Sequence, residues 1–157
     1  MRLFCPVLTS AKYLPTKYTF KGMKGGQGVS PPISWSDVPK DTQSFALTVV
    51  DQHPSARNQH HWFVINIPGS TREINEAASG VHLRMPSGSM ELRNSFAENA
   101  YVGPKPSPDT GAHQYLVTLY ALKVNPLRLG PYASMEQATA ELKKHILDKG
   151  TLAMLYE

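Results

Sequence analysis

The chain contains 157 residues, of which 41% are hydrophobic and 18% are charged, and its formal net charge at pH 7 is +4. A chain of this length and composition is typical of one soluble domain, here residues 1–157, with a substantial buried core. It has no apolar run of about 18 residues, no Lys/Arg-rich block and no aromatic RNA-binding motif, which argues against a transmembrane segment and against nucleic-acid binding.

The N-terminal segment is expected to be a strand and not a secretion signal. Residues Met1–Leu8 have one positive charge and a very short apolar run, and Lys12 and Pro15 follow too soon for a signal peptide. Cys5 is the single cysteine, so an intrachain disulfide cannot form and a reducing cytoplasm is the expected location. We interpret Cys5 as a small hydrophobic residue near the first strand.

The 13 prolines and 11 glycines divide the chain into short segments, as in folds of short strands joined by irregular loops. Runs of apolar residues predict strands at Leu3–Thr9, Lys17–Phe20, Ser44–Val50, Gln59–Pro68 and His113–Val124. A short last strand is expected within residues 151–156. The Gly/Lys stretch at residues 21–28 lacks the GxxxxGK[ST] spacing of a phosphate-binding P-loop.

The strand Gln59–Pro68 is the one around which we expect the chain to be organised. It begins with two histidines and a tryptophan, continues through apolar residues and ends at a Pro-Gly pair. Alternate residues of a strand share a face. One face should therefore carry His61, Phe63, Ile65 and Ile67. The other face should carry Trp62, Val64 and Asn66.

Two capping-box patterns predict helices in the second half of the chain. One precedes a short helix at Thr71–Ala77, and the other precedes a longer helix at Met135–Lys149, with Gly150 just beyond its end. Between them, Ala78–Tyr101 has little pattern and is expected to be a long surface excursion. Strands first and a helix last predict a mainly β, antiparallel fold with peripheral helices.

Four polar side chains are placed where predicted strands begin or end. Asp51 ends an apolar strand, His61 begins its own, and His113 and Tyr115 share a face of the strand that follows the loop Gly103–Gly111. We expect these four side chains to form a small polar pocket in which Asp51 orients His61. An imidazole and a phenol beside a loop with open backbone N–H groups would suit phosphate or another oxyanion. The alternative is that they are core polar residues whose hydrogen bonds are satisfied internally.

Two catalytic alternatives use the same region. Asp51, His61 and His113 could complete a two-histidine, one-carboxylate metal site for metal-assisted hydrolysis, but tight ligand spacings such as HxH or HExxH are absent. A Ser-His-Asp hydrolase is less favoured still, because the chain has no GxSxG motif and no serine stands out as a nucleophile. We therefore expect no enzymatic activity and no cofactor.

Four segments in collinear order resemble motifs of the phosphatidylethanolamine-binding protein family, which includes Raf kinase inhibitor protein. SPPISW at residues 30–35 resembles the family's SPPLSW, and residues 44–51 resemble the strand that leads into its DPDAP signature. HWFVINIP at residues 61–68 matches HWxxxNIP, and residues 103–115 resemble GPxPPxGxHRY. The resemblance extends from about Leu3 to Tyr156 and is greatest for the compact bacterial branch of the family.

The resemblance implies a sandwich of antiparallel β-sheets with peripheral short helices, one C-terminal helix and an anion pocket. Carried over by motif, the pocket residues are Asp51, His61, Gly103, Pro104, His113 and Tyr115. Family pockets of this kind take phosphate, acetate or a phosphorylethanolamine lipid headgroup and have no established catalytic role. Eukaryotic members bind kinases or proteases. The implied function is thus small-anion or headgroup binding with a regulatory role through protein partners.

Inhibition of a kinase or protease through surface loops, independent of the pocket, is the alternative that the resemblance leaves open. Bacterial members look prone to homodimerise, although no motif in this chain points to a dimer. The chain departs from the family pattern at DPDAP, which is replaced by a shorter turn, Asp51 to Pro54, that loses the second carboxylate. With His53 near that place, we expect a more basic rim. Gln114 also replaces the arginine that usually follows the pocket histidine.

Overall fold

Two antiparallel sheets form the fold in the computed structural model, which describes all residues 1–157. The larger sheet consists, in spatial order, of β6 (Met90–Glu91), β4 (His60–Pro68), β3 (Ser44–Asp51), β7 (His113–Leu122) and β8 (Ile146–Tyr156). The smaller sheet consists of β1 (Arg2–Phe4), β2 (Ile33–Ser36) and β5 (Glu73–Ile74). The helices are one α-helix and two 3-10 turns, namely α1 (Met135–Lys143), η1 (Thr16–Tyr18) and η2 (Pro54–Ala56).

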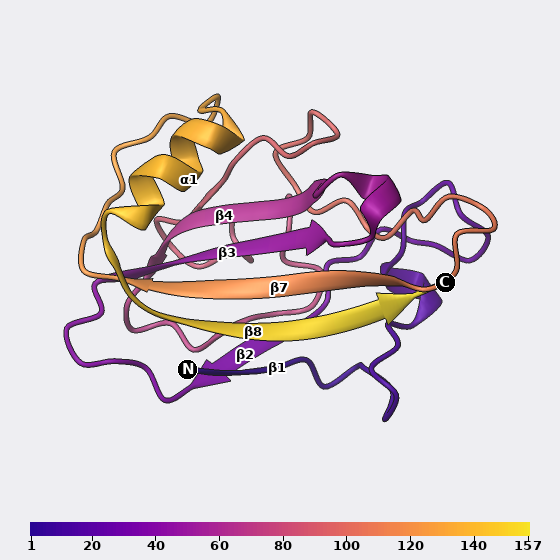
Figure 1. Cartoon of the computed structure of the whole chain (residues 1–157). Coiled ribbons are helices and arrows are strands. Elements are labelled where there is room, and N and C mark those ends of the chain that lie inside the picture. The colour runs from indigo at the N-terminus through magenta and orange to yellow at the C-terminus, as the bar shows by residue number, and fades with distance from the viewer.

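The larger sheet is the middle layer, with the smaller sheet on one face and α1 on the other (Figure 1). A core of 21 buried residues fills the space between the sheets, and a second core of eight buried residues lies under α1. Strand β3 shows why its sequence is apolar throughout: Phe45 and Leu47 belong to the first core, whereas Ala46 belongs to the second. The predicted mainly β, antiparallel sandwich with peripheral helices is confirmed.

Strand β4 contains a β-bulge at its start, opposite the end of β3. The register passes from the pair Val49–Trp62 directly to the pair Val50–His60, so His61 is an extra residue on β4. A bulge re-aims the side chain that it carries. His61 therefore points into the space between the two sheets, where its ring meets the Tyr115 ring edge to face.

The prediction that His61 shares a face with Phe63, Ile65 and Ile67 is therefore wrong. Phe63 and Ile65 do share a face, but they pack in the core under α1. A second irregularity follows at Asn66, whose φ of 57° is left-handed, and it returns Ile67 to the core between the sheets. Strict alternation fails because β4 gains one residue at each bulge.

Two short elements differ from the prediction. Residues 17–20 were predicted to be a strand, but η1 occupies this region, because the backbone amides of Tyr18 and Thr19 bond to carbonyls three residues earlier. The helix predicted at Thr71–Ala77 is absent, and β5 pairs with β2 instead. Ile74 is buried opposite Ile33, and the Trp35 amide donates to the Arg72 carbonyl, so pairing with β2 prevails over the local helical pattern.

The C-terminal helix begins as predicted and ends early. Ser134 and Gln137 form the expected capping box, in which each side chain bonds to the backbone amide of the other. The helix then stops at Lys143 and not at Lys149, because residues 146–156 pair with β7 along its length. Gly150, predicted to lie just beyond the helix, is instead buried within β8.

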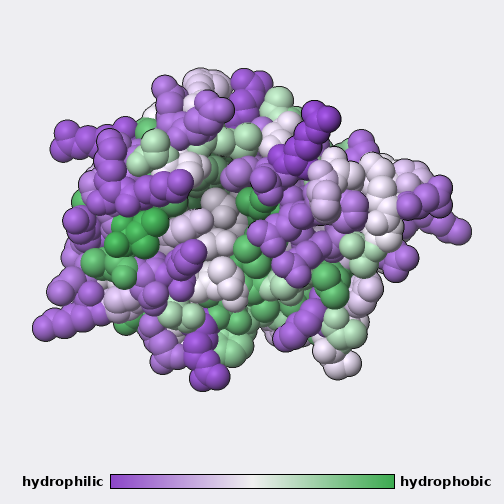
Figure 2. Space-filling model, viewed as in Figure 1, coloured by the Kyte–Doolittle hydropathy of each residue, from purple (hydrophilic) through white to green (hydrophobic).

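The long excursion at residues 78–101 has few regular elements, as expected, except for β6, which pairs with the edge of β4. The outer face of the larger sheet is only partly covered by α1, and a hollow of about 240 Å³ over β3 and β7 is visible beside the helix (Figure 2). The surface in this view is mainly hydrophilic, with separate hydrophobic areas. The chain has no helix with the length and apolar character needed to cross a membrane.

Gly150 offers a test of how tightly the N-terminal strand packs against β8. A Cβ atom at this position would lie 2.5 Å from Leu3 Cδ1 and 2.8 Å from the Met1 carbonyl oxygen. Gly150→Ala should therefore lower the free energy of unfolding by about 1–3 kcal/mol through overpacking, as measured by urea denaturation. Gly130→Ala is the matched control, because a Cβ there meets no atom within 4 Å. Equal stability of the two variants would contradict this packing.

Candidate functional site

The four polar residues predicted to form a pocket do meet at one end of the larger sheet. Asp51 ends β3 and is paired in register with Tyr115 of β7, and His113 lies two residues before Tyr115 on the same face. The bulge of β4 adds His61 beside them. All four residues are at most 3% exposed. In Figure 1 this is the end of the sheet where η1, η2 and the loop before β7 gather.

Asp51 and His113 form a buried charge-assisted pair. His113 Nδ1 lies 2.7 Å from Asp51 Oδ2, while Asp51 Oδ1 accepts a 2.9 Å hydrogen bond from the backbone amide of His53. On its other side, His113 Nε2 lies 2.7 Å from the Thr110 hydroxyl, which donates to the Ser107 carbonyl at 2.7 Å. A hydroxyl has one hydrogen, so both Thr110 contacts are satisfied together when His113 Nε2–H is the donor.

This geometry corrects two expectations for the pocket. Asp51 was expected to orient His61, but its carboxylate bonds to His113 instead. His113 was expected to offer a donor to the ligand, but both of its ring nitrogens have partners within the protein. His113 therefore holds Asp51 in place and forms part of the pocket wall.

His61 is held by the backbone of Val102. The His61 ring nitrogen Nδ1 lies 2.8 Å from the Val102 carbonyl oxygen, and the Val102 amide donates to the His61 carbonyl at 2.9 Å. A carbonyl only accepts, so we assign the hydrogen to Nδ1, and Nε2 of the neutral ring is left as an acceptor. Nε2 is buried and has no hydrogen-bond partner. Burial lowers the pKa of His61, against the smaller opposite effects of the Val102 carbonyl and the Asp51 charge.

The Tyr115 hydroxyl is the second buried polar group without a hydrogen-bond partner. Its ring lies at 90° to the His61 ring, with the centroids 5.1 Å apart, so the two side chains that carry the free groups are in contact. Burial raises the pKa of Tyr115, and the Asp51 carboxylate raises it further through its charge and its proximity to the hydroxyl, although the two groups do not meet the geometry of a hydrogen bond. The hydroxyl therefore stays protonated at neutral pH and can donate a hydrogen bond. The backbone amide of Lys105 lies on the same side and favours negative charge there.

The loop before β7 approaches the pocket through Gly103 and Pro104, both of which are buried. A Cβ at Gly103 would lie 2.4 Å from the Tyr18 carbonyl oxygen, so only glycine fits this close contact with η1. The Phe20 amide donates to the Pro104 carbonyl at 3.1 Å and fastens the two segments together. Their role in the wall of an anion pocket, which the family resemblance implies, stays a prediction.

His53 takes the rim position expected from the altered Asp51–Pro54 turn. Its ring stacks on the His113 ring, with centroids 3.9 Å apart and planes only 8° from parallel. The His53 Nδ1 atom accepts from the Ser55 amide at the start of η2, which fixes the orientation of the ring. A second imidazole therefore covers His113 where the family motif has a carboxylate.

Several residues of the site escaped the sequence analysis. Val102, Thr110 and Phe96 contact the pocket imidazoles, and Phe96 packs on His61 with ring centroids 4.8 Å apart. Buried Asn94 shapes the loop that carries Phe96, because the side-chain oxygen Oδ1 of Asn94 accepts hydrogen bonds from the backbone amides of Phe96 and Glu98. Val102 acts through its backbone, so no side-chain signal could have revealed it. Thr110 lies only three residues before His113 in the sequence, so its hydroxyl could have been predicted as a hydrogen-bond partner of that ring.

The metal alternative is not supported by the arrangement of side chains. No group of three or more His, Cys, Asp or Glu side chains is placed to hold a metal ion. The imidazole of His113 and the carboxylate of Asp51 are directed at each other, and one ring nitrogen of His61 bonds to the Val102 carbonyl. A metal centre would need all three to turn toward one point.

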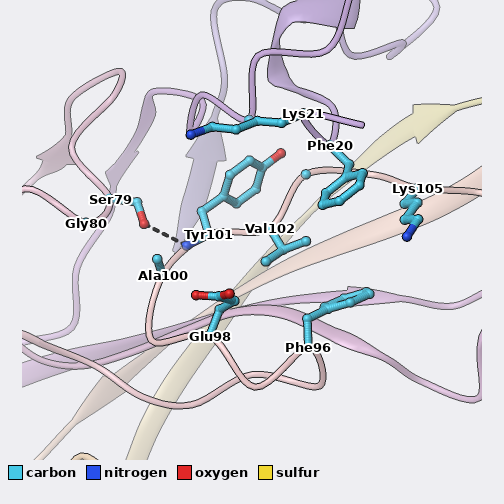
Figure 3. Close-up of a pocket in the computed structure, with 12 residues that line it drawn as sticks. Phe20, Lys21, Ser79, Gly80, Phe96, Glu98, Ala100, Tyr101, Val102 and Lys105 are labelled. Atoms are coloured by element: carbon cyan, nitrogen blue, oxygen red, sulfur yellow. Dashed lines mark hydrogen bonds between the residues drawn. The ribbon is translucent and has the colours of Figure 1, made fainter. Parts of the chain in front are cut away.

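A groove of about 550 Å³ adjoins the pocket and shares Gly103, Val102 and Phe96 with it (Figure 3). Its lining combines aromatic and charged side chains, including Phe20, Tyr101, Lys21, Glu98 and Lys105. The Lys105 ammonium lies 4.5 Å from the centre of the Phe20 ring, which fixes one positive charge beside the pocket mouth.

Comparison with known proteins agrees with this geometry. The profile of the phosphatidylethanolamine-binding protein family matches residues 6–157. The chain belongs to this family. The UPF0098 protein YbhB of Escherichia coli is 29% identical to this family member over 99% of both chains. A UPF0098 protein of Methanothermobacter thermautotrophicus is 34% identical over 91% of this chain and 89% of its own.

A solved structure extends the comparison to three dimensions. The crystal structure of Escherichia coli YbcL, described as a new member of the mammalian family, superposes with a TM-score of 0.91 at 26% identity. The superposition covers 99% of this chain and 97% of YbcL. This family member therefore has the fold that its sequence motifs indicated.

The lowered pKa of His61 predicts how stability changes with pH in the absence of an anion. An unfolded histidine titrates near 6.5, whereas buried His61 takes up its proton only at lower pH. The unfolded chain thus binds more protons, and the free energy of unfolding should fall as the pH drops below about 6.5. His61→Gln should flatten this decline between about pH 6.5 and 5, as measured by urea denaturation at each pH.

His60 also has a pKa lowered by burial, so part of the decline should remain in that variant. The carboxyl groups with lowered pKa values, including Glu141 and Asp148, act at more acidic pH. An unchanged pH dependence in His61→Gln would show that the buried ring is not neutral as assigned.

Proposed function

We propose that this family member binds a small anion, such as phosphate or the phosphate of a phosphorylated headgroup, in the pocket formed by Asp51, His61, Gly103, His113 and Tyr115. The observation that carries the proposal is the pair of buried, unpartnered groups, His61 Nε2 and the Tyr115 hydroxyl, which face one site. Leaving a buried polar group unpaired costs about 1–3 kcal/mol. A ligand that pairs with both groups would recover this cost.

The positive surroundings support an anion over a neutral ligand. Asp51 is the one acidic residue of the pocket set, and its carboxylate is occupied by His113 and by the His53 amide. The Lys105 amide and the stacked His53 ring add donors or positive charge near the mouth. Coulombic attraction and open donors both favour a negatively charged oxygen ligand.

The adjoining groove suggests where the rest of a headgroup would lie. Its aromatic walls can cover an apolar or organic segment, and Lys21 and Lys105 lie where further negative charge would be stabilised. Glu98 also lines the groove and offers a carboxylate to an ammonium such as that of ethanolamine. A free phosphate would fill the pocket alone.

We propose binding without turnover. The Thr110–His113–Asp51 chain has the connectivity of a nucleophile, a base and an orienting acid. However, Thr110 donates its hydrogen to the Ser107 carbonyl, so its oxygen faces His113 as an acceptor. A nucleophile must instead pass its hydrogen to the histidine. This arrangement favours a structural role for the chain of hydrogen bonds.

A regulatory role through a protein partner is the second candidate function, and one observation favours it. Leu83 is 93% exposed and Val81 is 43% exposed, both in the excursion at residues 78–101. Exposed apolar side chains in a long loop suit a kinase, a protease or another protein surface. In a pull-down, Leu83→Ser should release such a partner, while Tyr115→Phe should retain it. The cytoplasmic location and a homodimer remain predictions.

Tyr115→Phe tests anion binding most directly, because it removes a single oxygen from the pocket. The variant should bind phosphate about tenfold or more weakly, since one hydrogen bond to a charged ligand is lost. Chemical shifts of backbone amides around Gly103 and Tyr115, followed during phosphate titration, would measure this. The same variant should be as stable as the wild type or more so without phosphate, because the buried hydroxyl has no partner.

Tyr120→Phe is the matched control, because Tyr120 lies on the same strand but packs toward the core under α1. It should leave phosphate affinity unchanged. If phosphate at millimolar concentration shifts no resonance near His61 and Tyr115 in the wild type, the proposed function is wrong.

A further inference from the structure

The pocket offers a bound anion one lone pair, at His61 Nε2, and one hydrogen, at the Tyr115 hydroxyl. This combination limits which protonation state of the anion can bind. We infer that the pocket binds an anion together with one proton, held between His61 Nε2 and an anion oxygen. The preferred ligand class is then a monoprotonated phosphate or phosphate monoester, which supplies this proton itself. The inference rests on the proposed function and specifies the form of the ligand that the site takes.

The argument starts from the fixed tautomer of His61. The 2.8 Å contact with the Val102 carbonyl places the ring hydrogen on Nδ1, so the neutral ring presents a lone pair at Nε2. An anion oxygen also presents lone pairs. The two would repel each other in a site with little water unless a proton lies between them. Tyr115 differs, since its hydroxyl can donate its own hydrogen.

The other side chains of the pocket do not supply the missing hydrogen. Both ring nitrogens of His113 already have partners, Asp51 Oδ2 and the Thr110 hydroxyl. The Asp51 carboxylate accepts from His113 and from the His53 amide. The proton must therefore come from the ligand or from solvent, through protonation of His61.

The groups around His61 determine when it accepts that proton. Asp51 on β3 favours the charged ring, and the adjacent His60 on β4 disfavours it. On β7, Tyr115 contributes a neutral hydroxyl and His113 is paired with Asp51, while the Phe96 ring adds no charge. Burial prevails in the empty pocket and lowers the pKa of His61. A bound anion reverses this balance by adding a negative charge beside Nε2.

Sulfate and phosphate distinguish the two sources of the proton. Sulfate has no acidic hydrogen near neutral pH, so it can bind only as His61 becomes protonated, and its affinity should fall about tenfold per pH unit above the pKa of His61. Inorganic phosphate, the probe used below, loses its second proton near neutral pH, and a phosphate monoester does so near pH 6. Its affinity should therefore follow the fraction of the monoprotonated form and decline more gently between about pH 5.5 and 7.

The experiment measures the affinity of the full chain for sulfate and for inorganic phosphate by NMR titration from pH 5.5 to 8. The wild type should show a slope near one decade per pH unit for sulfate at the upper end of this range. On addition of sulfate, the ¹⁵N resonance of His61 Nε2 should move from the unprotonated to the protonated position. This second measurement needs no variant and remains decisive if a substitution destabilises the fold.

His61→Gln replaces Nε2 by a carboxamide whose N–H donates at any pH, so its sulfate affinity should vary less than twofold over the same range. His60→Gln makes the same change at the neighbouring residue, whose ring bonds to the Asn58 carbonyl and stacks on Phe63. It should keep the wild-type slope. A slope that persists in His61→Gln would overturn the inference.

Two further outcomes separate the inference from the proposed function. If both anions bind to the wild type with affinity independent of pH, and the His61 Nε2 resonance does not move, the pocket binds anions but not the proton. If neither anion shifts pocket resonances at any pH, the proposed function and the inference are both wrong.

Discussion

The paired hydrogen bonds between His61 and Val102 determine the character of the pocket. One bond joins the backbones, and the other fixes the imidazole at 2.8 Å. The first fastens the pocket loop to the bulge of β4, and the second selects the tautomer that leaves Nε2 open. If Nε2 of the same ring bonded to Asp51, as its sequence position suggested, this nitrogen would be satisfied within the protein. The backbone contact with Val102 keeps the site available to a ligand.

Much of this arrangement was predictable from the sequence, because it depends on the two-residue period of β-strands and on the positions of polar residues at the strand ends. The apolar run before Asp51 had to be a buried central strand, and the spacing of His113 and Tyr115 put them on one face. Antiparallel pairing of β3 with β7 then brings Asp51 opposite Tyr115. Motif resemblance supplied the remaining link to His61 and Gly103. Together these signals identified the fold and the main side chains of the pocket.

The failures share a physical cause, which is that tertiary pairing overrides local pattern. The extra residue at His61 is set by hydrogen bonds to Val102 and Asn94, neither of which is near in sequence. Strand β8 takes residues 146–149 from the predicted helix because β7 offers a continuous ladder. Asp51 bonds to His113 because β3 pairs with β7, which brings the start of β7 beside the end of β3. Sequence patterns of period 2 or 3.6 cannot encode such contacts.

Unpaired buried groups are not confined to the pocket, and this makes the pocket pair informative. Trp35 Nε1 and His145 Nδ1 also lack hydrogen-bond partners, yet Trp35 packs edge to face on Phe45 in the core, and His145 lies by the end of α1. Neither has a second unpaired group in contact with it, so each only lowers the stability of the fold. His61 and Tyr115 instead pack against one another beside a groove, next to a loop whose Lys105 amide lies near the Tyr115 hydroxyl. The groups that could have satisfied them are already used in the Asp51–His113 and His61–Val102 hydrogen bonds. Two unpaired groups in contact are what a binding site requires and a core would avoid.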